Sequence, residues 1–145
     1  LYEGGIRTPM LARWPEHIEA GRTSDYPWAF WDFLPTMAAL TGAAPPAGLD
    51  GINVLPELLG QPQAAHGPLY WEFHERGFDQ AIRDGKWKAV RHGLSGPVEL
   101  YGLNADIGER NDLAAQHPEV VREMEALFTA SRTDSDLFPV TAEKK

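Results

Sequence analysis

The stretch LYWEFHERGFDQAIRDGKWKAVRH, residues 69–92, decides the fold of this chain. Its first six residues, 69–74, alternate between apolar and polar side chains, which is typical of a β-strand with two different faces. Residues 78–83 form a second strand-like run, and Asp84-Gly85 after it is a strong signal for a tight hairpin turn. Residues 86–91 then return as a third strand, so the stretch predicts antiparallel pairing.

The residues after this stretch complete an α+β fold. Residues 98–101 are a fourth strand candidate, and Pro118 suits the first position of a helix, where its missing N–H costs nothing. We therefore predict that residues 67–145 form a subdomain in which a small antiparallel β-sheet of about four strands packs with a C-terminal amphipathic helix. The helix has an apolar stripe at helical spacing that consists of Val120, Val121, Met124, Leu127 and Phe128.

The part of the chain before this subdomain contains different signals. Residues 9–14 are apolar enough for a short buried strand, which Pro15 would end. Residues 32–41 predict a helix with Pro35 in its first turn and Gly42 as its C-terminal cap. A short helical piece is expected at 55–59, after a region rich in Pro, Gly and Ala.

Composition limits the function classes. The chain has 145 residues, of which 43% are apolar, so it can bury a core, and its net charge of −8 does not favour nucleic acid as a partner. It has no cysteine, so a disulfide, a Cys-ligated metal and a Cys nucleophile are excluded within these residues. No apolar run has the length of a membrane span, and no membrane partner is expected.

Several short segments occur in one order along nearly the whole chain, and in that order they resemble the C-terminal third of the sulfatase family, within the alkaline-phosphatase-like superfamily. Each segment alone is a weak signal, but their co-linearity is specific. The segments are Tyr2-Glu3-Gly4-Gly5-Ile6-Arg7-Thr8-Pro9, Arg13-Trp14-Pro15, Asp32-Phe33-Leu34-Pro35-Thr36, Asp50-Gly51-Ile52, Leu69-Tyr70-Trp71-Glu72-Phe73-His74-Glu75, Ala81-Ile82-Arg83-Asp84-Gly85-Lys86-Trp87-Lys88 and Glu99-Leu100-Tyr101.

The resemblance implies a division of labour. Sulfatases hydrolyse sulfate esters with a formylglycine, made in a Cys/Ser-x-Pro-x-Arg motif, and with a calcium ion, and both belong to a large N-terminal α/β domain. That motif is not found in these residues, so we expect no catalytic residue and no metal site in this chain. Residues 1–60 are then expected to be the C-terminal end of the large domain.

The same resemblance implies that the chain, which begins at Leu1 without an initiating Met, is a fragment of a sulfuric ester hydrolase and inactive alone. Its partners would be the missing N-terminal sulfatase domain and a sulfated small molecule or carbohydrate. The sequence does not reveal the compartment, although the family suggests a periplasmic or extracellular protein.

Candidate site residues follow from the resemblance. We expect His74, Glu75, Arg76 and Gln80 to bind substrate, although the residues alone favour an exposed histidine at a sheet edge. Glu3 and Arg7 flank the double glycine and are expected to support the active site indirectly, as a buried ion pair. Other polar and aromatic residues have simpler interpretations: a basic strip of Lys86, Lys88, Arg91 and His92 as a solvated face, and Trp71 and Phe73 as core residues.

Two other functions stay open at this point. The parent is alternatively a phosphodiesterase or phosphonate hydrolase of the same superfamily, or the chain is a non-catalytic binding or interaction module that has kept the fold. Separation from a larger domain would also expose apolar side chains, so self-association of the isolated chain is expected. The residues concerned are Trp14, Trp28, Phe30, Trp31 and Phe33.

Overall fold

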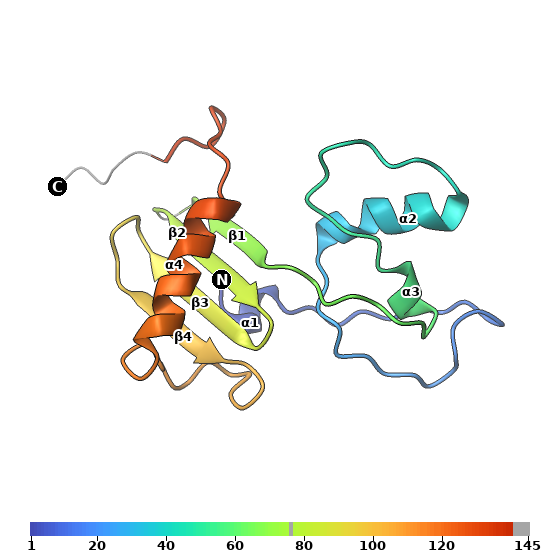
Figure 1. The fold of residues 1–145 in the computed structure, drawn as a ribbon, viewed down its shortest axis with the longest axis horizontal. Coiled ribbons are helices and arrows are strands. Elements are labelled where there is room, and N and C mark those ends of the chain that lie inside the picture. The colour runs from blue at the N-terminus through green and yellow to red at the C-terminus, as the bar shows by residue number, and fades with distance from the viewer. Residues whose placement is uncertain (76, 141–145) are drawn as a thin grey trace. The chain divides into compact units, whose positions relative to one another are not determined.

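A computed structural model describes residues 1–75 and 77–140, and their contacts divide the chain into two compact units (Figure 1). One unit combines Leu1–Thr8 with the chain from Gly67 onward, and the other consists of Pro9–His66. The assignment of residues 1–60 to a larger α/β domain stays a prediction.

The first unit is built on a four-stranded antiparallel sheet with the strands in chain order. Asp84 pairs with Trp87, so Gly85 and Lys86 form the tight turn between the second and third strands, and Gly85 takes a φ of 54°, which favours glycine. This confirms the predicted sheet and its central hairpin. The strands are β1 (Leu69–Phe73), β2 (Asp79–Asp84), β3 (Trp87–His92) and β4 (Val98–Gly102).

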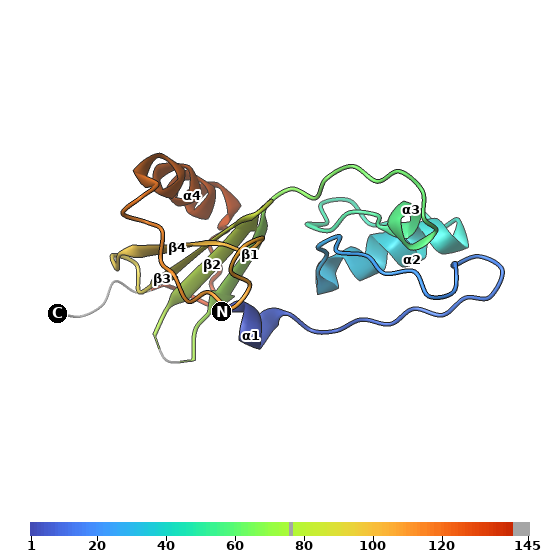
Figure 2. The ribbon, with the colours of Figure 1, turned by 90° about the horizontal axis from the view of Figure 1, so that it is seen from below.

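Helix α4 (Pro118–Ser131) covers one face of the sheet (Figure 2). Pro118 occupies the first turn, and Val120, Met124 and Phe128 are buried on the side that faces the sheet. They pack against a set of strand residues that includes Ile82, and burying a Phe of this kind contributes about 3–5 kcal/mol relative to Ala. The predicted combination of sheet and C-terminal helix is thus confirmed.

The opposite face of the sheet is covered by the N-terminal residues. Helix α1 (Glu3–Ile6) lies on this side in Figure 2, and Leu1 and Tyr2 before it pack on a second apolar cluster with Trp71. The buried members of that cluster are Ala81, Val90, Tyr101 and Leu103.

This second cover corrects one expectation about β1. The alternation predicted that Trp71 and Phe73 share an apolar face that packs in the core, with Tyr70 on the opposite, polar face. Tyr70 instead packs against the core under α4, Trp71 packs on the α1 side, and Phe73 is 39% exposed. Both faces of the sheet are covered, so a polar residue in the alternating pattern does not mark a solvent face.

The second unit contains three short helical elements, η1 (Phe30–Asp32), α2 (Phe33–Thr41) and α3 (Leu55–Leu58). Gly42 follows α2 with a φ of 72°, and its N–H donates to the last turn, which confirms the predicted helix and cap.

The strand expected at residues 9–14 is wrong, because this segment is irregular and exposed throughout. A strand needs a neighbour for its backbone hydrogen bonds, and within the described residues the sheet contains only the four strands of the first unit.

A buried carboxylate organises the second unit. Asp32 is fully buried and accepts hydrogen bonds from the backbone N–H of Ala29 at 2.7 Å and of Ile52 at 2.9 Å. Gly51 lies so close that an added Cβ would be 2.0 Å from the carbonyl oxygen of Trp31. The Asp-Gly turn is therefore fixed to the start of α2 by both hydrogen bonding and close backbone contact.

Among the helices that the structure describes, none is long and apolar enough to cross a membrane.

Candidate functional site

Two predicted substrate-binding residues, His74 and Gln80, lie in one polar network on the α4 side of the sheet. The backbone register explains this, because Glu72 pairs with Gln80 and Gln80 pairs with Arg91 across three neighbouring strands. Side chains directly opposite each other on one face of a sheet interact. We call this group the Glu72 network; its members are Tyr70, Glu72, His74, Gln80, Arg91 and Arg132.

Glu72 is the centre of the network. Its Oε1 accepts a hydrogen bond from the Tyr70 hydroxyl at 2.6 Å and lies 3.1 Å from Arg132 Nε. Its Oε2 lies 2.9 Å from His74 Nε2. The carboxylate thus holds an imidazole, a phenol and a guanidinium in fixed positions, and charge-assisted contacts of this type are stronger than neutral ones.

Gln80 connects this centre to Arg91. The Gln80 side chain is almost fully buried, donates to the Tyr70 hydroxyl at 2.6 Å and accepts from Arg91 Nε at 3.1 Å. Burial, together with the hydrogen bond to Glu72, raises the pKa of Tyr70, so the phenol stays a neutral donor. Gln80 is therefore a fixed internal link rather than an exposed contact residue.

His74 is the member of the network that is best placed to meet a ligand. Its side chain retains 27% exposure, while its ring lies 5.2 Å from that of Phe78 and 5.6 Å from that of Phe138. Two aromatic neighbours and one carboxylate fix the ring plane and leave part of the imidazole open. Such a group donates or accepts hydrogen bonds with hydroxyl-rich ligands.

The other two predicted substrate-binding residues, Glu75 and Arg76, do not belong to the Glu72 network as described. Glu75 lies exposed in the turn after β1, and Arg76 lies outside the described residues. Sequence reasoning missed Tyr70, Glu72 and Arg132. The shared face of residues 70, 72 and 74 could have indicated the Glu72–His74 pair, whereas Arg132 follows α4 and gave no local signal.

A second polar group lies on the α1 side of the sheet. Lys88 is fully buried, and its Nζ lies 2.9 Å from Glu3 Oε1 and 3.5 Å from Glu109 Oε1. The backbone N–H of Glu3 also donates to Glu109 Oε2 at 2.5 Å. We call Glu3, Lys88 and Glu109 the Lys88 cluster; it fixes the first residues of the chain to the sheet.

The Lys88 cluster corrects two expectations. The buried ion pair of Glu3 is with Lys88, while Arg7 is exposed. Lys88 does not belong to a solvated basic strip, because the alternation of β3 places it on the α1 side and Arg91 on the α4 side, where the Arg91 guanidinium lies 5.0 Å from the Phe128 ring. The four basic residues therefore do not form one surface.

Tyr2 extends the contacts on the α1 side. Its hydroxyl donates to Glu99 Oε2 at 2.5 Å and lies 3.1 Å from His92 Nε2. Burial, with the hydrogen bond to Glu99, raises the pKa of Tyr2 to about 12. The phenol is thus a donor and not a nucleophile at neutral pH.

The residues present do not fit the calcium ion or the formylglycine that a sulfatase requires. Among residues 1–75 and 77–140, no group of three or more His, Cys, Asp or Glu side chains is arranged to hold a metal ion. The segment Ser95-Gly96-Pro97-Val98-Glu99 has Glu where the formylglycine motif requires Arg. No catalytic step is therefore assigned to the side chains that the structure describes.

Comparisons with known proteins agree on one family. The family model described as N-sulphoglucosamine sulphohydrolase, C-terminal, matches residues 1–134. Arylsulfatase A of Homo sapiens is 35% identical over 157 residues, which cover 87% of this chain and 30% of that protein. The N-acetylgalactosamine-6-O-sulfatase of Bacteroides thetaiotaomicron is 30% identical over 148 residues, which cover 91% of this chain and 28% of that protein.

A solved structure described as a 2-O GAG sulfatase aligns with a TM-score of 0.63 and 31% identity, and the alignment covers 77% of this chain and 27% of the other. The chain therefore spans less than a third of the length of these relatives.

Proposed function

The chain belongs to the C-terminal region of the sulfatase family, and from this membership we propose that it is the substrate-side part of a longer sulfuric ester hydrolase. The observation that carries the proposal is the family match over residues 1–134. It is supported by the polar network around His74, which presents a partly exposed imidazole beside a fixed carboxylate.

Hydrolysis of a sulfate ester needs a nucleophile, a Lewis acid and stabilisation of charge on the sulfuryl oxygens. In the proposed enzyme, formylglycine and calcium supply the first two, and both belong to the N-terminal domain. The described residues of this chain contain no cluster of three or more His, Cys, Asp or Glu side chains that could hold a metal ion. We therefore expect the chain alone to be inactive.

The proposed role of the Glu72 network is to form part of the wall of the substrate pocket. His74 contacts hydroxyl or amide groups of a sulfated carbohydrate or small molecule, and Glu72 and Gln80 hold His74 and its surroundings in place. Glu75, in the turn after β1, and Arg76 stay proposed contacts. Binding energy from substrate groups remote from the scissile bond is used in this way to set selectivity.

The proposed role of Glu3 is to position the chain near the active site. The Lys88 cluster holds the segment of Glu3 against the sheet through a buried ion pair. Arg7, which is exposed in this chain, is proposed to act with Glu3 only when the large domain is present.

Assays with two esters separate this proposal from its rivals. We expect the longer protein that contains this chain to hydrolyse nitrophenyl sulfate much faster than nitrophenyl phenylphosphonate, and the isolated chain to hydrolyse neither. Preference for the phosphonate ester would support the phosphonate hydrolase instead. Absence of turnover by the longer protein, with tight glycan binding by the isolated chain, would support a binding module.

A further inference from the structure

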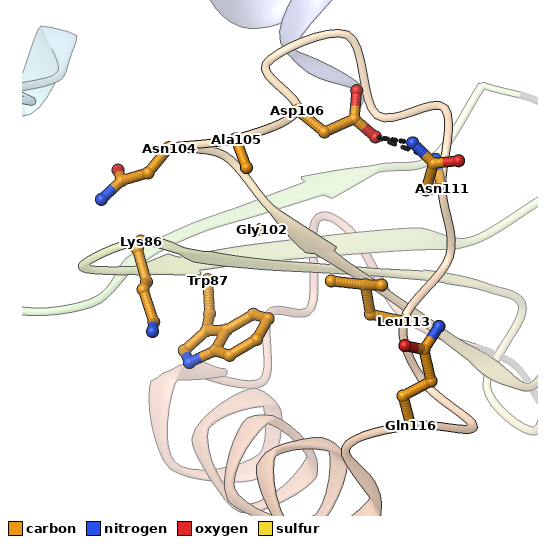
Figure 3. Close-up of a pocket in the computed structure, with 9 residues that line it drawn as sticks. All are labelled: Lys86, Trp87, Gly102, Asn104, Ala105, Asp106, Asn111, Leu113 and Gln116. Carbon is orange, nitrogen blue, oxygen red and sulfur yellow. Dashed lines mark hydrogen bonds between the residues drawn. The ribbon is translucent and has the colours of Figure 1, made fainter.

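A pocket of about 650 Å³ opens at the end of the sheet where β3 begins and β4 ends (Figure 3). Trp87 and Gly102 are cross-strand partners there, whereas Arg91 pairs with Val98 near the opposite end of the same two strands. Four residues along a strand correspond to about 13 Å, so the pocket is separate from the Glu72 network.

The floor of the pocket is apolar because Gly102 has no side chain. A Cβ at Gly102 would lie 3.5 Å from Leu113 Cδ1 and 3.7 Å from Trp87 Cζ3, which are ordinary contact distances. Anything larger than a methyl group would therefore extend into the space between these two side chains. The missing side chain leaves part of the Trp87 indole and of Leu113 facing the pocket, while the His117 ring lies 5.1 Å from that of Trp87.

The rim of the pocket is polar and carries a cation. The Lys86 ammonium lies 5.0 Å from the centre of the Trp87 ring, and the amide side chains of Asn104 and Gln116 line the same pocket. Figure 3 shows Lys86, Trp87, Leu113 and Gln116 around one opening.

The acid on the rim, Asp106, is already engaged. It accepts hydrogen bonds from the backbone N–H groups of Arg110 and Asn111, both at 2.8 Å, and from the Asn111 side chain at 3.2 Å. Asp106 therefore closes its own loop while it keeps its negative charge, and Lys86 is the cation of the rim that an anionic group meets.

We propose that this pocket binds a single pyranose unit that carries an anionic substituent. The apolar face of the ring packs on Trp87 and Leu113, since an aromatic ring offers a large flat apolar surface. The amides of Asn104 and Gln116 exchange hydrogen bonds with ring hydroxyls, and Lys86 pairs with the anion. A single sugar in an open pocket binds with a dissociation constant on the order of 1 mM.

The site would give the protein a second point of attachment to a charged glycan, apart from the proposed pocket wall at His74. This inferred sugar site goes beyond the proposed function. It rests on the proposed function only in the choice of sulfate as the anionic substituent. If the longer protein hydrolyses sulfate esters but the pocket binds no sugar, only this inference fails.

The test is a titration of the isotope-labelled chain with galactose 6-sulfate and with galactose, followed by the indole N–H signals. We expect the Trp87 signal to move saturably, with galactose 6-sulfate binding at least about fivefold more tightly than galactose. The Trp71 signal should stay in place, because its side chain packs on the opposite face of the sheet.

Two variants locate the binding. Gly102→Val fills the floor of the pocket and should abolish the shift of Trp87 with both sugars, while Lys86→Met keeps the apolar stem and should remove only the preference for the sulfated sugar. An unmoved Trp87 signal at sugar concentrations of about 50 mM, well above the expected dissociation constant, would overturn the proposal. Equal affinities for the two sugars in the unmodified chain would overturn it as well.

Discussion

Replacement of Lys88 by Met tests the physical account of the sheet most severely. Lys88 is fully buried between two carboxylates, Glu3 and Glu109, whose side chains are 4% and 3% exposed. Met has nearly the volume of the Lys stem, so the change removes the ammonium and leaves packing almost intact. Removing one partner of a buried ion pair leaves uncompensated charge and typically costs about 3–5 kcal/mol.

Urea unfolding followed by the indole signals of Trp71 and Trp87 measures this loss within one unit of the chain. With a slope of about 2 kcal/mol per molar urea, the midpoint should fall by about 2 M. The matched control is Lys86→Met, which makes the same change at an exposed position in the turn before β3 and should cost about 1 kcal/mol or less.

A triple variant, Glu3→Gln, Lys88→Met and Glu109→Gln, should recover much of the lost stability, since it removes the buried charges together. The reasoning is refuted if Lys88→Met costs no more than Lys86→Met.

Three further predictions follow from separate parts of the chain. Burial is the chief cause that raises the pKa of Tyr2 from 10.0 to about 12. The stabilisation that the fold gains from the neutral phenol is therefore complete below pH 10 and is lost as pH rises through 12. Phenolate absorbance that appears near pH 10 in the folded chain would contradict this. Gly51→Ala should lower the free energy of unfolding in urea by about 1–3 kcal/mol or more, because the new Cβ would meet the carbonyl of Trp31. The control Gly4→Ala, which has nothing within 4 Å of the new Cβ, should change it very little. Similar losses in the two variants would argue against the close contact. We also propose that the isolated chain self-associates, so its mass in light scattering should rise with concentration. Phe30→Ser should lower this mass, since Phe30 is 93% exposed. A monomer at all concentrations would exclude self-association.

Local patterns in the sequence were sufficient to predict the sheet and the last helix. The alternation in residues 69–74, the Asp84-Gly85 turn and the stripe that begins at Val120 each act over a few residues, so one sequence contains the whole signal. The observed strands and α4 follow these signals closely.

Contacts between distant residues could not be predicted in the same way. The ammonium of buried Lys88 pairs with Glu3, which is 85 residues away in the sequence. Nothing in the sequence near Lys88 indicates this contact. Tyr70 packs against the core for a similar reason: α4, from the far end of the chain, covers the polar face of β1, while Leu1 and Tyr2 cover the face of Trp71. The failed strand at residues 9–14 shows the converse, since an apolar run without a neighbour does not form a strand.

The candidate site was predicted in part for these reasons. His74 and Gln80 belong together because their strands are neighbours, which the hairpin signals allow. Arg132 joins Glu72 only through the packing of α4 on the sheet, which sequence patterns do not specify in detail.

The most direct test of the central claim is the kinetics of sulfate ester hydrolysis by the longer protein and its His74→Ala variant. If this chain forms the substrate side of the pocket, His74→Ala should raise KM for a sulfated disaccharide about tenfold with little change in kcat. It should leave nitrophenyl sulfate almost unaffected, and Arg122→Ala, at an exposed position of α4, should leave both substrates unaffected. An unchanged KM for the disaccharide, or an equal loss with both substrates, would contradict the proposed role.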